Sequence, residues 1–186
     1  MNNAMYKALI IGCGKIAGGE PNLNSFTHAG SIKADERIEL VGGVDYNIKK
    51  AQRFANQHQC KAFWDIEEAI IQTSPNIVSV CTPDSTHYEI AKKVLTMNSA
   101  PKILFLEKPV CSSNEEYSNL LELANKRKIL VIANHTRRFS ILHKDLRELI
   151  MSGKLGSPYR VNAIYYSGWL HNGIHLVDTI LYLFNE

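Results

Sequence analysis

Along the first part of the chain, short continuous runs of apolar residues alternate with segments of helical periodicity. A short apolar run between polar turns is typical of a strand that is buried on both faces of a sheet. The predicted strands cover residues 8–11, 38–44, 60–63, 77–81, 103–106 and 129–133. The predicted helices cover residues 48–57, 66–72 and 86–97 and a segment from a Ser113–Glu116 capping box to about Lys126. This alternation with short connections predicts an α/β fold with a doubly wound parallel sheet.

The pattern changes near Asn134. A polar stretch over residues 134–139 precedes an amphipathic helix over 141–151, and Gly153 is placed to end that helix. A Tyr- and Val-rich strand is predicted over 157–167, followed by a helix over 169–184. We therefore expect two domains, residues 1–134 and 135–186.

A glycine motif, Gly12-x-Gly14-x-x-Ala17, follows the first predicted strand directly. This spacing fits a dinucleotide-binding turn: Gly12 permits a tight turn, Gly14 lets a pyrophosphate approach the backbone, and Ala17 keeps the next helix close to the sheet. The phosphates are expected at a helix N-terminus, beside Lys15 and Ile16. On its own, the motif fits an ordinary strand–turn–helix connection equally well.

An acidic residue, Asp45, ends the second predicted strand, where a carboxylate can accept a hydrogen bond from a ribose 2′-OH. Because Asp45 would repel a 2′-phosphate and neither Tyr46 nor Asn47 is an arginine, NAD is expected rather than NADP. Lys49 and Lys50 leave NADP possible. The stretch of sequence from Gly12 to Asp45 is longer than in the compact motif, and a polar insertion over residues 19–24 accounts for the extra length.

Composition narrows the function classes. The chain has 186 residues, of which 45% are hydrophobic and 21% charged. Its net charge is only +3 and its sequence contains no long run of basic residues, so a nucleic-acid partner is not expected. No apolar run reaches the length of a membrane span, about 18 residues. Four cysteines without a C-x-x-C pair read as buried thiols in a reducing compartment, so a cytoplasmic location is expected.

Four segments together resemble the glucose–fructose oxidoreductase/inositol dehydrogenase (Gfo/Idh/MocA) family. They are the glycine motif, Cys81-Thr-Pro-Asp-Ser-Thr-His87, Glu107-Lys108-Pro109 and Gly173-Ile-His175-x-x-Asp178. The resemblance implies a Rossmann-type domain followed by an α+β substrate domain, of which this chain holds only the start. It also implies a nicotinamide-dependent oxidoreductase.

The resemblance assigns catalytic roles to Lys108 and His175. Lys108 would donate a hydrogen bond to the reacting hydroxyl, and the Lys108–Pro109 bond would be cis. The plain alternative is a lysine at a strand end beside a turn proline. His175 would be the acid/base, a role that suits imidazole because its pKa lies near neutrality.

His171 is a departure, because the family pattern has Asp at this position. A second imidazole could relay protons but carries no permanent negative charge, so either the proton route differs or the site is no longer catalytic; His171 could also only cap the helix. His171 and His175 share a helix face, yet Asn172 replaces the Glu of a zinc-protease motif and no third ligand is in register. We therefore expect no metal.

The turn at Thr82 and Pro83 is implied to run along the cofactor. His87 could contact the cofactor edge, although packing at the helix start is the favoured interpretation, and Arg138 could line the cleft or pair with an acidic neighbour. The residues expected to bind the cofactor are Gly12, Gly14, Lys15, Ile16, Asp45, Thr82, Pro83, His87, Glu107 and Lys108.

The expected function is hydride transfer between NAD(P) and a secondary alcohol carbon of a sugar, cyclitol or sugar nucleotide. One alternative is a non-catalytic dinucleotide-binding module, and another is a Rossmann-type relative that reduces a different acceptor. With the chain ending at Glu186, the strand Tyr159–Ser167 is expected to be disordered or paired with another copy. The substrate cleft would then have only one wall, so little or no turnover is expected. The last helix is expected to dock on the nucleotide domain.

Overall fold

The computed structural model describes residues 5–20, 26–166 and 168–184, without the side chains of residues 170 and 171. The chain divides into two compact units, residues 1–133 and 134–186. Each unit is described by itself below.

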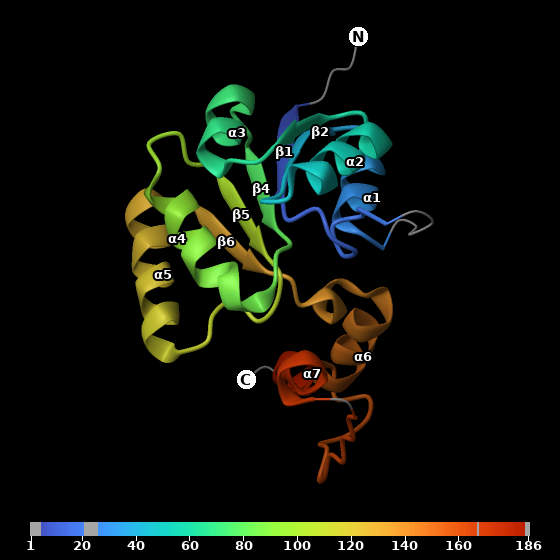
Figure 1. Cartoon of the computed structure of the whole chain (residues 1–186). Coiled ribbons are helices and arrows are strands. Elements are labelled where there is room, and N and C mark those ends of the chain that lie inside the picture. The colour runs from blue at the N-terminus through green and yellow to red at the C-terminus, as the bar shows by residue number, and fades with distance from the viewer. Residues whose placement is uncertain (1–4, 21–25, 167, 185–186) are drawn as a thin grey trace. The chain divides into compact units, whose positions relative to one another are not determined.

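The first unit contains a six-stranded, entirely parallel sheet (Figure 1). Its strands are β1 (Tyr6–Ile11), β2 (Ile38–Val44), β3 (Lys61–Phe63), β4 (Ile77–Val80), β5 (Ile103–Leu106) and β6 (Leu130–Ala133). The spatial order β3-β2-β1-β4-β5-β6 reverses direction between β1 and β4. Ligands of open α/β sheets bind outside the carboxyl ends of the strands at such a reversal, so the topology points to the segments that follow β1 and β4.

Helices connect the strands. They are α1 (His28–Lys33), α2 (Ile48–His58), α3 (Ile66–Thr73), the 3₁₀ turn η1 (Asp84–Thr86), α4 (His87–Thr96) and α5 (Asn114–Arg127). Two N-caps predict their helices correctly: the Asp65 carboxylate accepts from the N–H of Glu68 at 2.8 Å, and the Ser113 hydroxyl accepts from the N–H of Glu116 at 3.2 Å. Side-chain acceptors at these positions satisfy amides that have no partner inside the helix.

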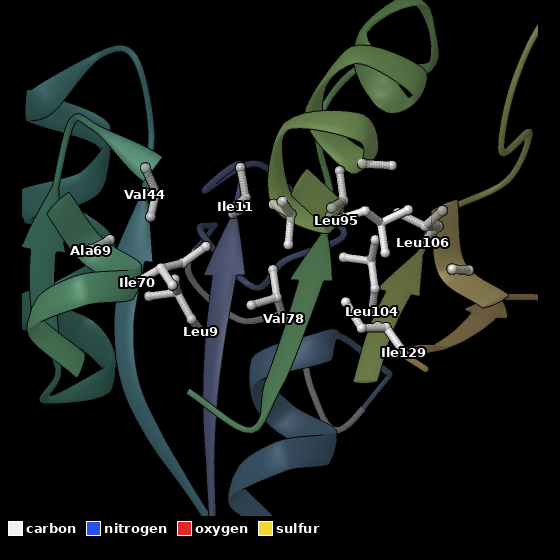
Figure 2. Close-up of a cluster of buried hydrophobic side chains, with 14 of the residues drawn as sticks. Leu9, Ile11, Val44, Ala69, Ile70, Val78, Leu95, Leu104, Leu106 and Ile129 are labelled. Atoms are coloured by element: carbon white, nitrogen blue, oxygen red, sulfur yellow. The ribbon is translucent and has the colours of Figure 1, made fainter. Parts of the chain in front are cut away.

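Apolar side chains are buried on both faces of the sheet. Along β1, Leu9 and Ile11 belong to one core cluster, whereas Ala8 and Ile10 belong to the other. Figure 2 shows the first cluster, in which Ile70 of α3 and Leu95 of α4 pack beside the strands. Because successive side chains point to opposite faces, burial on both sides requires a continuous apolar strand. The predicted doubly wound parallel fold is thus confirmed.

The helix after the glycine motif begins only at His28, beyond the polar insertion expected over residues 19–24, so Lys15 and Ile16 do not lie at a helix N-terminus as expected. Residues 15–18 form a turn, and the only helix before β2 in the described residues is α1, which begins at His28. The N–H groups of His28 and Ala29 donate to the carbonyls of Ile16 and Ala17, at 3.1 and 3.0 Å. These first amides of α1 are therefore occupied by the turn and are not open to a phosphate.

The second unit is helical in its described part. It contains the 3₁₀ turn η2 (Thr136–Phe139), α6 (Ile141–Met151), a π-helical turn η3 (Trp169–Gly173) and α7 (Ile174–Phe184). The strand predicted over 157–167 is wrong for residues 157–166, which have no regular secondary structure, while residue 167 lies outside the described residues. A strand forms only against a partner, and all six strands of the described residues lie in the first unit. No helix in the described residues has the length and apolar character needed to span a bilayer.

Candidate active site

A cavity of about 440 Å³ opens at the carboxyl ends of β1, β2 and β4. The backbone of the glycine motif, the end of β2 and the turn after β4 form its walls, and Trp64 adds an aromatic surface. Five residues of the expected cofactor site line it: Gly12, Gly14, Asp45, Thr82 and Pro83. Lys15, Ile16, His87, Glu107 and Lys108 are not among the described residues that line this cavity, so their predicted contacts with a cofactor remain predictions.

The two glycines of the motif meet different surroundings. At Gly12, φ is +90°, and an added Cβ would lie 2.8 Å from the Cys81 backbone and the Thr82 side chain. At Gly14, an added Cβ would meet no atom of the described residues within 4 Å. The fold therefore requires glycine at position 12, whereas at position 14 the missing side chain leaves room beside the cavity.

Two backbone amides of the turn have no acceptor among the described residues. Among the described residues, the N–H groups of Lys15 and Ile16 make no hydrogen bond within the chain, and the turn is closed instead by the N–H of Gly19, which donates to Gly14 O at 2.9 Å. Free amides next to an open glycine suit the oxygens of a pyrophosphate. Among the described residues, open backbone amides thus lie at this turn, whereas the first amides of α1 are occupied.

Asp45 is a buried carboxylate, only 8% exposed, at the end of β2. Its Oδ2 accepts from the N–H of Cys13 at 3.0 Å, and its Oδ1 accepts from the N–H of Asn47 at 2.9 Å. Each carboxylate oxygen can accept further hydrogen bonds, so these contacts orient the group without using up its capacity for ribose hydroxyls. Lys50 lines the same cavity and is the one described cation placed to meet a 2′-phosphate there.

The Glu107-Lys108-Pro109 segment follows β5 at the same edge of the sheet. The Lys108–Pro109 bond is cis, which confirms that prediction. Glu107 Oε1 lies 2.8 Å from Nε2 of His28 in α1, and the His28 ring packs edge-on against Phe105 with centroids 5.6 Å apart. The amino-acid sequence alone does not single out His28, because its partner lies 79 positions away and no local spacing connects the two.

His87 is 1% exposed at the first turn of α4. Its Nδ1 lies 2.6 Å from the carbonyl oxygen of Pro109, and its Nε2 lies 2.8 Å from that of Thr82. Both ring nitrogens thus face backbone oxygens of two loops at the edge of the sheet. This geometry supports the packing interpretation of His87 over direct contact with a cofactor.

In the second unit, α7 carries His175 and Asp178. The Arg138 guanidinium of η2 donates to Asp178 Oδ1 from Nε at 2.8 Å and from Nη2 at 2.7 Å, so Arg138 pairs with an acidic neighbour. His135, which the sequence analysis did not single out, lies with Nδ1 3.6 Å from Asp178 Oδ2 and its ring edge-on to His175, with centroids 6.5 Å apart. The side chain of His171 lies outside the described part of the chain.

The thiols near the cavity are not nucleophiles. Burial raises the pKa of Cys13 to about 12, with a further contribution from the Asp45 charge, and burial also raises the pKa of Cys81 well above its usual value. Both groups are protonated near neutral pH. Within the described residues, no group of three or more His, Cys, Asp or Glu side chains is arranged to hold a metal ion.

A dinucleotide fits the donors and acceptors of the first unit. The open turn at Gly14 offers amides to phosphate, Asp45 offers acceptors to a ribose, and Trp64, Ile66 and Pro83 offer apolar surface to a base.

Comparison with known proteins agrees with this assignment. A family model described as an oxidoreductase family with an NAD-binding Rossmann fold, Gfo/Idh/MocA, matches residues 6–135. The D-glucoside 3-dehydrogenase of Escherichia coli (strain K12) is 26% identical, over 98% of this chain and 55% of that protein. The glucose-6-phosphate 3-dehydrogenase of Bacillus subtilis (strain 168) is 28% identical, with the same coverage of 98% and 55%. The chain thus spans about half the length of these curated relatives.

Solved structures show the same fold. A scyllo-inositol dehydrogenase from Lactobacillus casei, solved with bound NAD(H) and scyllo-inositol, matches with a TM-score of 0.77 at 16% identity. That match covers 96% of this chain and 56% of the other.

Proposed function

Since the chain belongs to the Gfo/Idh/MocA oxidoreductase family with an NAD-binding Rossmann fold, we propose that it transfers a hydride between NAD(P) and a secondary alcohol carbon of a sugar, cyclitol or sugar nucleotide. The observation that carries the proposal is the placement of Lys108 two residues after the end of β5, at the sheet edge where the nucleotide cavity opens after β1, β2 and β4. A cation at this edge can meet a hydroxyl presented to a bound nicotinamide.

The chain's own residues would bind the cofactor and orient the substrate. The amides of the turn at Gly14 would hold the pyrophosphate, and Asp45 would accept from the adenosine ribose. Bound NAD(P) supplies the hydride acceptor or donor. Lys108 would donate a hydrogen bond to the substrate oxygen, which stabilises negative charge as the C–H bond breaks.

His175 would take the hydroxyl proton during oxidation and return it during reduction. In the second unit, the first turn of α7 holds His175 near His135, and the Arg138–Asp178 pair ties this helix to η2. His171 would act as a second imidazole on the same proton route. His171 and His175 would then titrate as a coupled pair, and the pH–rate profile would report the pair rather than either ring alone.

The names of two relatives support the substrate class that we propose. Two of them are named as dehydrogenases of position 3 of a D-glucoside and of glucose 6-phosphate. We propose a ring hydroxyl of a hexose derivative as the first substrate to test, with an inositol as the second because the scyllo-inositol dehydrogenase has the same fold.

A single-turnover assay of NAD reduction against methyl glucosides, glucose 6-phosphate, inositols and UDP-sugars tests the function. Lys108→Ala should lower the rate by about 10²–10³ and leave NAD affinity nearly unchanged, since it removes a donor aimed at developing charge. The matched control is Lys102→Ala, an exposed lysine at the opposite end of β5. An undiminished rate in Lys108→Ala would leave Lys108 a structural role only.

A non-catalytic dinucleotide-binding module is the second candidate, favoured by the presence of His171 where the family pattern has Asp. Tight NAD binding, with no NAD reduction in the presence of any substrate of the panel, would support this second candidate. His171→Asp separates the two: alcohol oxidation that appears only in this variant would identify the substitution as the cause of inactivity.

A further inference from the structure

His87 connects two loops that leave neighbouring parallel strands. Thr82 follows β4, Pro109 follows β5, and β4 and β5 are hydrogen-bonded neighbours in the sheet. The ring is buried between the loops, with Nε2 2.8 Å from Thr82 O and Nδ1 2.6 Å from Pro109 O. One side chain of α4 therefore contacts both backbones.

Buried carbonyl oxygens need hydrogen-bond donors, and a buried carbonyl left without a donor destabilises the fold. A ring with one proton donates to one of the two carbonyls, and a ring with two protons donates to both. A displacement of either loop would change the distance to a ring nitrogen and would be felt by the other loop through the same rigid ring. His87 is thus a mechanical link as well as a packing element.

The first loop is a wall of the nucleotide cavity. Thr82, Pro83 and Thr86 line the cavity, and the Thr86 hydroxyl lies 2.8 Å from the Thr82 hydroxyl and 2.7 Å from Pro83 O. These bonds join the wall to the start of α4, next to His87. A nucleotide that presses on Thr82 or Pro83 therefore acts on a segment that His87 holds.

The second loop carries Lys108, and both neighbours of Lys108 are anchored. On one side, the Glu107 carboxylate contacts the buried His28 ring at 2.8 Å, with side-chain exposures of 12% and 8%. On the other side, Pro109 O is held by His87. Because His28 fixes Glu107 to α1, motion passed through His87 to Pro109 would appear as a local reorientation of Lys108.

We propose that His87 is a positioning residue that couples occupancy of the nucleotide cavity to the placement of Lys108. The coupling itself is a property of the first unit, and its use in catalysis rests on the function proposed above for Lys108. Through it, cofactor binding would set the substrate-facing lysine before substrate arrives.

The test uses ADP as the probe, because ADP fills the adenosine and phosphate parts of the site and brings no nicotinamide that could touch Lys108 directly. Lysines of the full chain are reductively methylated with ¹³C, and the Lys108 resonance is assigned by its loss in Lys108→Arg. ADP binding is measured separately by calorimetry. The resonance is then followed to saturating ADP in the unaltered chain, in His87→Leu and in the matched control Thr96→Val, which removes a side-chain bond to backbone carbonyls at the other end of α4.

We expect ADP to shift the Lys108 resonance in the unaltered chain and in Thr96→Val, and to shift it by less than half as much in saturated His87→Leu. His87→Gln, whose amide can donate to one carbonyl, should restore part of the response, which a purely structural residue would not do. An equal shift in His87→Leu, or no shift in the unaltered chain despite bound ADP, would overturn the coupling. Absence of ADP binding to the unaltered chain would remove the nucleotide site itself, and with it both the proposed function and the coupling.

A second measurement applies if His87→Leu does not fold. In the unaltered chain labelled with ¹⁵N-histidine, a His87 ring proton should exchange slowly with solvent, and its signal should move on ADP addition. A ring proton that exchanges rapidly, or one that ignores ADP, would overturn the proposal.

Discussion

The carboxylate of Asp45 accepts a hydrogen bond from the backbone N–H of Cys13 at 3.0 Å. This contact ties the end of β2 to the glycine motif after β1, and the other carboxylate oxygen accepts from the N–H of Asn47 at 2.9 Å. The residue expected to choose between NAD and NADP is therefore also a residue that holds the turn of the glycine motif in place. A change of charge at position 45 acts on both features together.

Asp45→Asn should weaken NAD binding and reduce the preference for NAD over NADP. The amide keeps one acceptor oxygen, but its NH₂ group faces a backbone N–H, and the charge that repels a 2′-phosphate is gone. We expect the ratio of the two affinities to fall by about tenfold, equivalent to 1.4 kcal/mol, in calorimetric titrations. Asp35→Asn, which alters a surface carboxylate paired with Arg37, is the control and should leave the ratio unchanged. Tighter binding of NADP than NAD by the unaltered chain would contradict the assignment of Asp45.

Most elements of the sheet could be predicted from sequence because each has a local cause. The strand over 103–106 is a short apolar run bounded by Lys102 and Glu107, and the structure has β5 at Ile103–Leu106. Asp65 predicts the start of α3 because its side chain caps the helix. The cis bond before Pro109 came from the family resemblance and not from local physics.

The parts that sequence did not predict depend on distant partners. The contact between His28 and Glu107 joins α1 to the end of β5, and neither residue shows this in its local pattern. His87 could be singled out, but its double contact requires the loops after β4 and β5 to lie side by side. The segment over 157–166 failed as a strand because Tyr and Val favour strands only where a neighbouring strand is present.

The N-cap of α3 should make a pH-dependent contribution to stability. The N–H of Glu68, the largest cause, lowers the pKa of Asp65 below its usual 3.8, and Lys93 lowers it further. Because the folded pKa is the lower one, the contribution is present above the unfolded pKa of about 3.9 and is lost as pH falls through the folded pKa. Asp65→Ala should lower the free energy of unfolding by about 1 kcal/mol at pH 7, and urea titrations should show this gap narrowing below about pH 4. Asp65→Asn keeps an uncharged cap, so its loss at pH 7 should be smaller than that of Asp65→Ala, and the difference between these two variants should not change with pH because neither carries the titrating carboxylate. A gap between the unaltered chain and Asp65→Ala that stays constant down to low pH would argue against the cap.

The Tyr-rich segment should promote self-association. Tyr159, Ile164 and Tyr166 are 102%, 91% and 86% exposed, and unpaired extended chain with apolar side chains tends to pair with another copy. We expect light scattering to show a mass that rises with concentration, and replacing these three residues by Ser should abolish the rise. Phe26→Ser, which removes a 91% exposed aromatic side chain of the first unit, is the control. A concentration-independent monomer would contradict the prediction.

Alanine substitutions at Gly12 and Gly14 should have separate effects, the first on stability and the second on cofactor binding. In Gly12→Ala, the new methyl group would lie 2.8 Å from the Cys81 backbone at a φ of +90°, so the free energy of unfolding should fall by about 1–3 kcal/mol. In Gly14→Ala, the methyl group meets no atom within 4 Å in the part of the chain that the structure describes, so stability should stay unchanged. The same methyl group would occupy the space that a pyrophosphate needs, so NAD affinity should fall by about tenfold or more, equivalent to at least 1.4 kcal/mol. Thermal unfolding and calorimetric NAD titration of the two variants measure these outcomes side by side. Gly14→Ala with the NAD affinity of the unaltered chain would show that the phosphates bind elsewhere than at this turn.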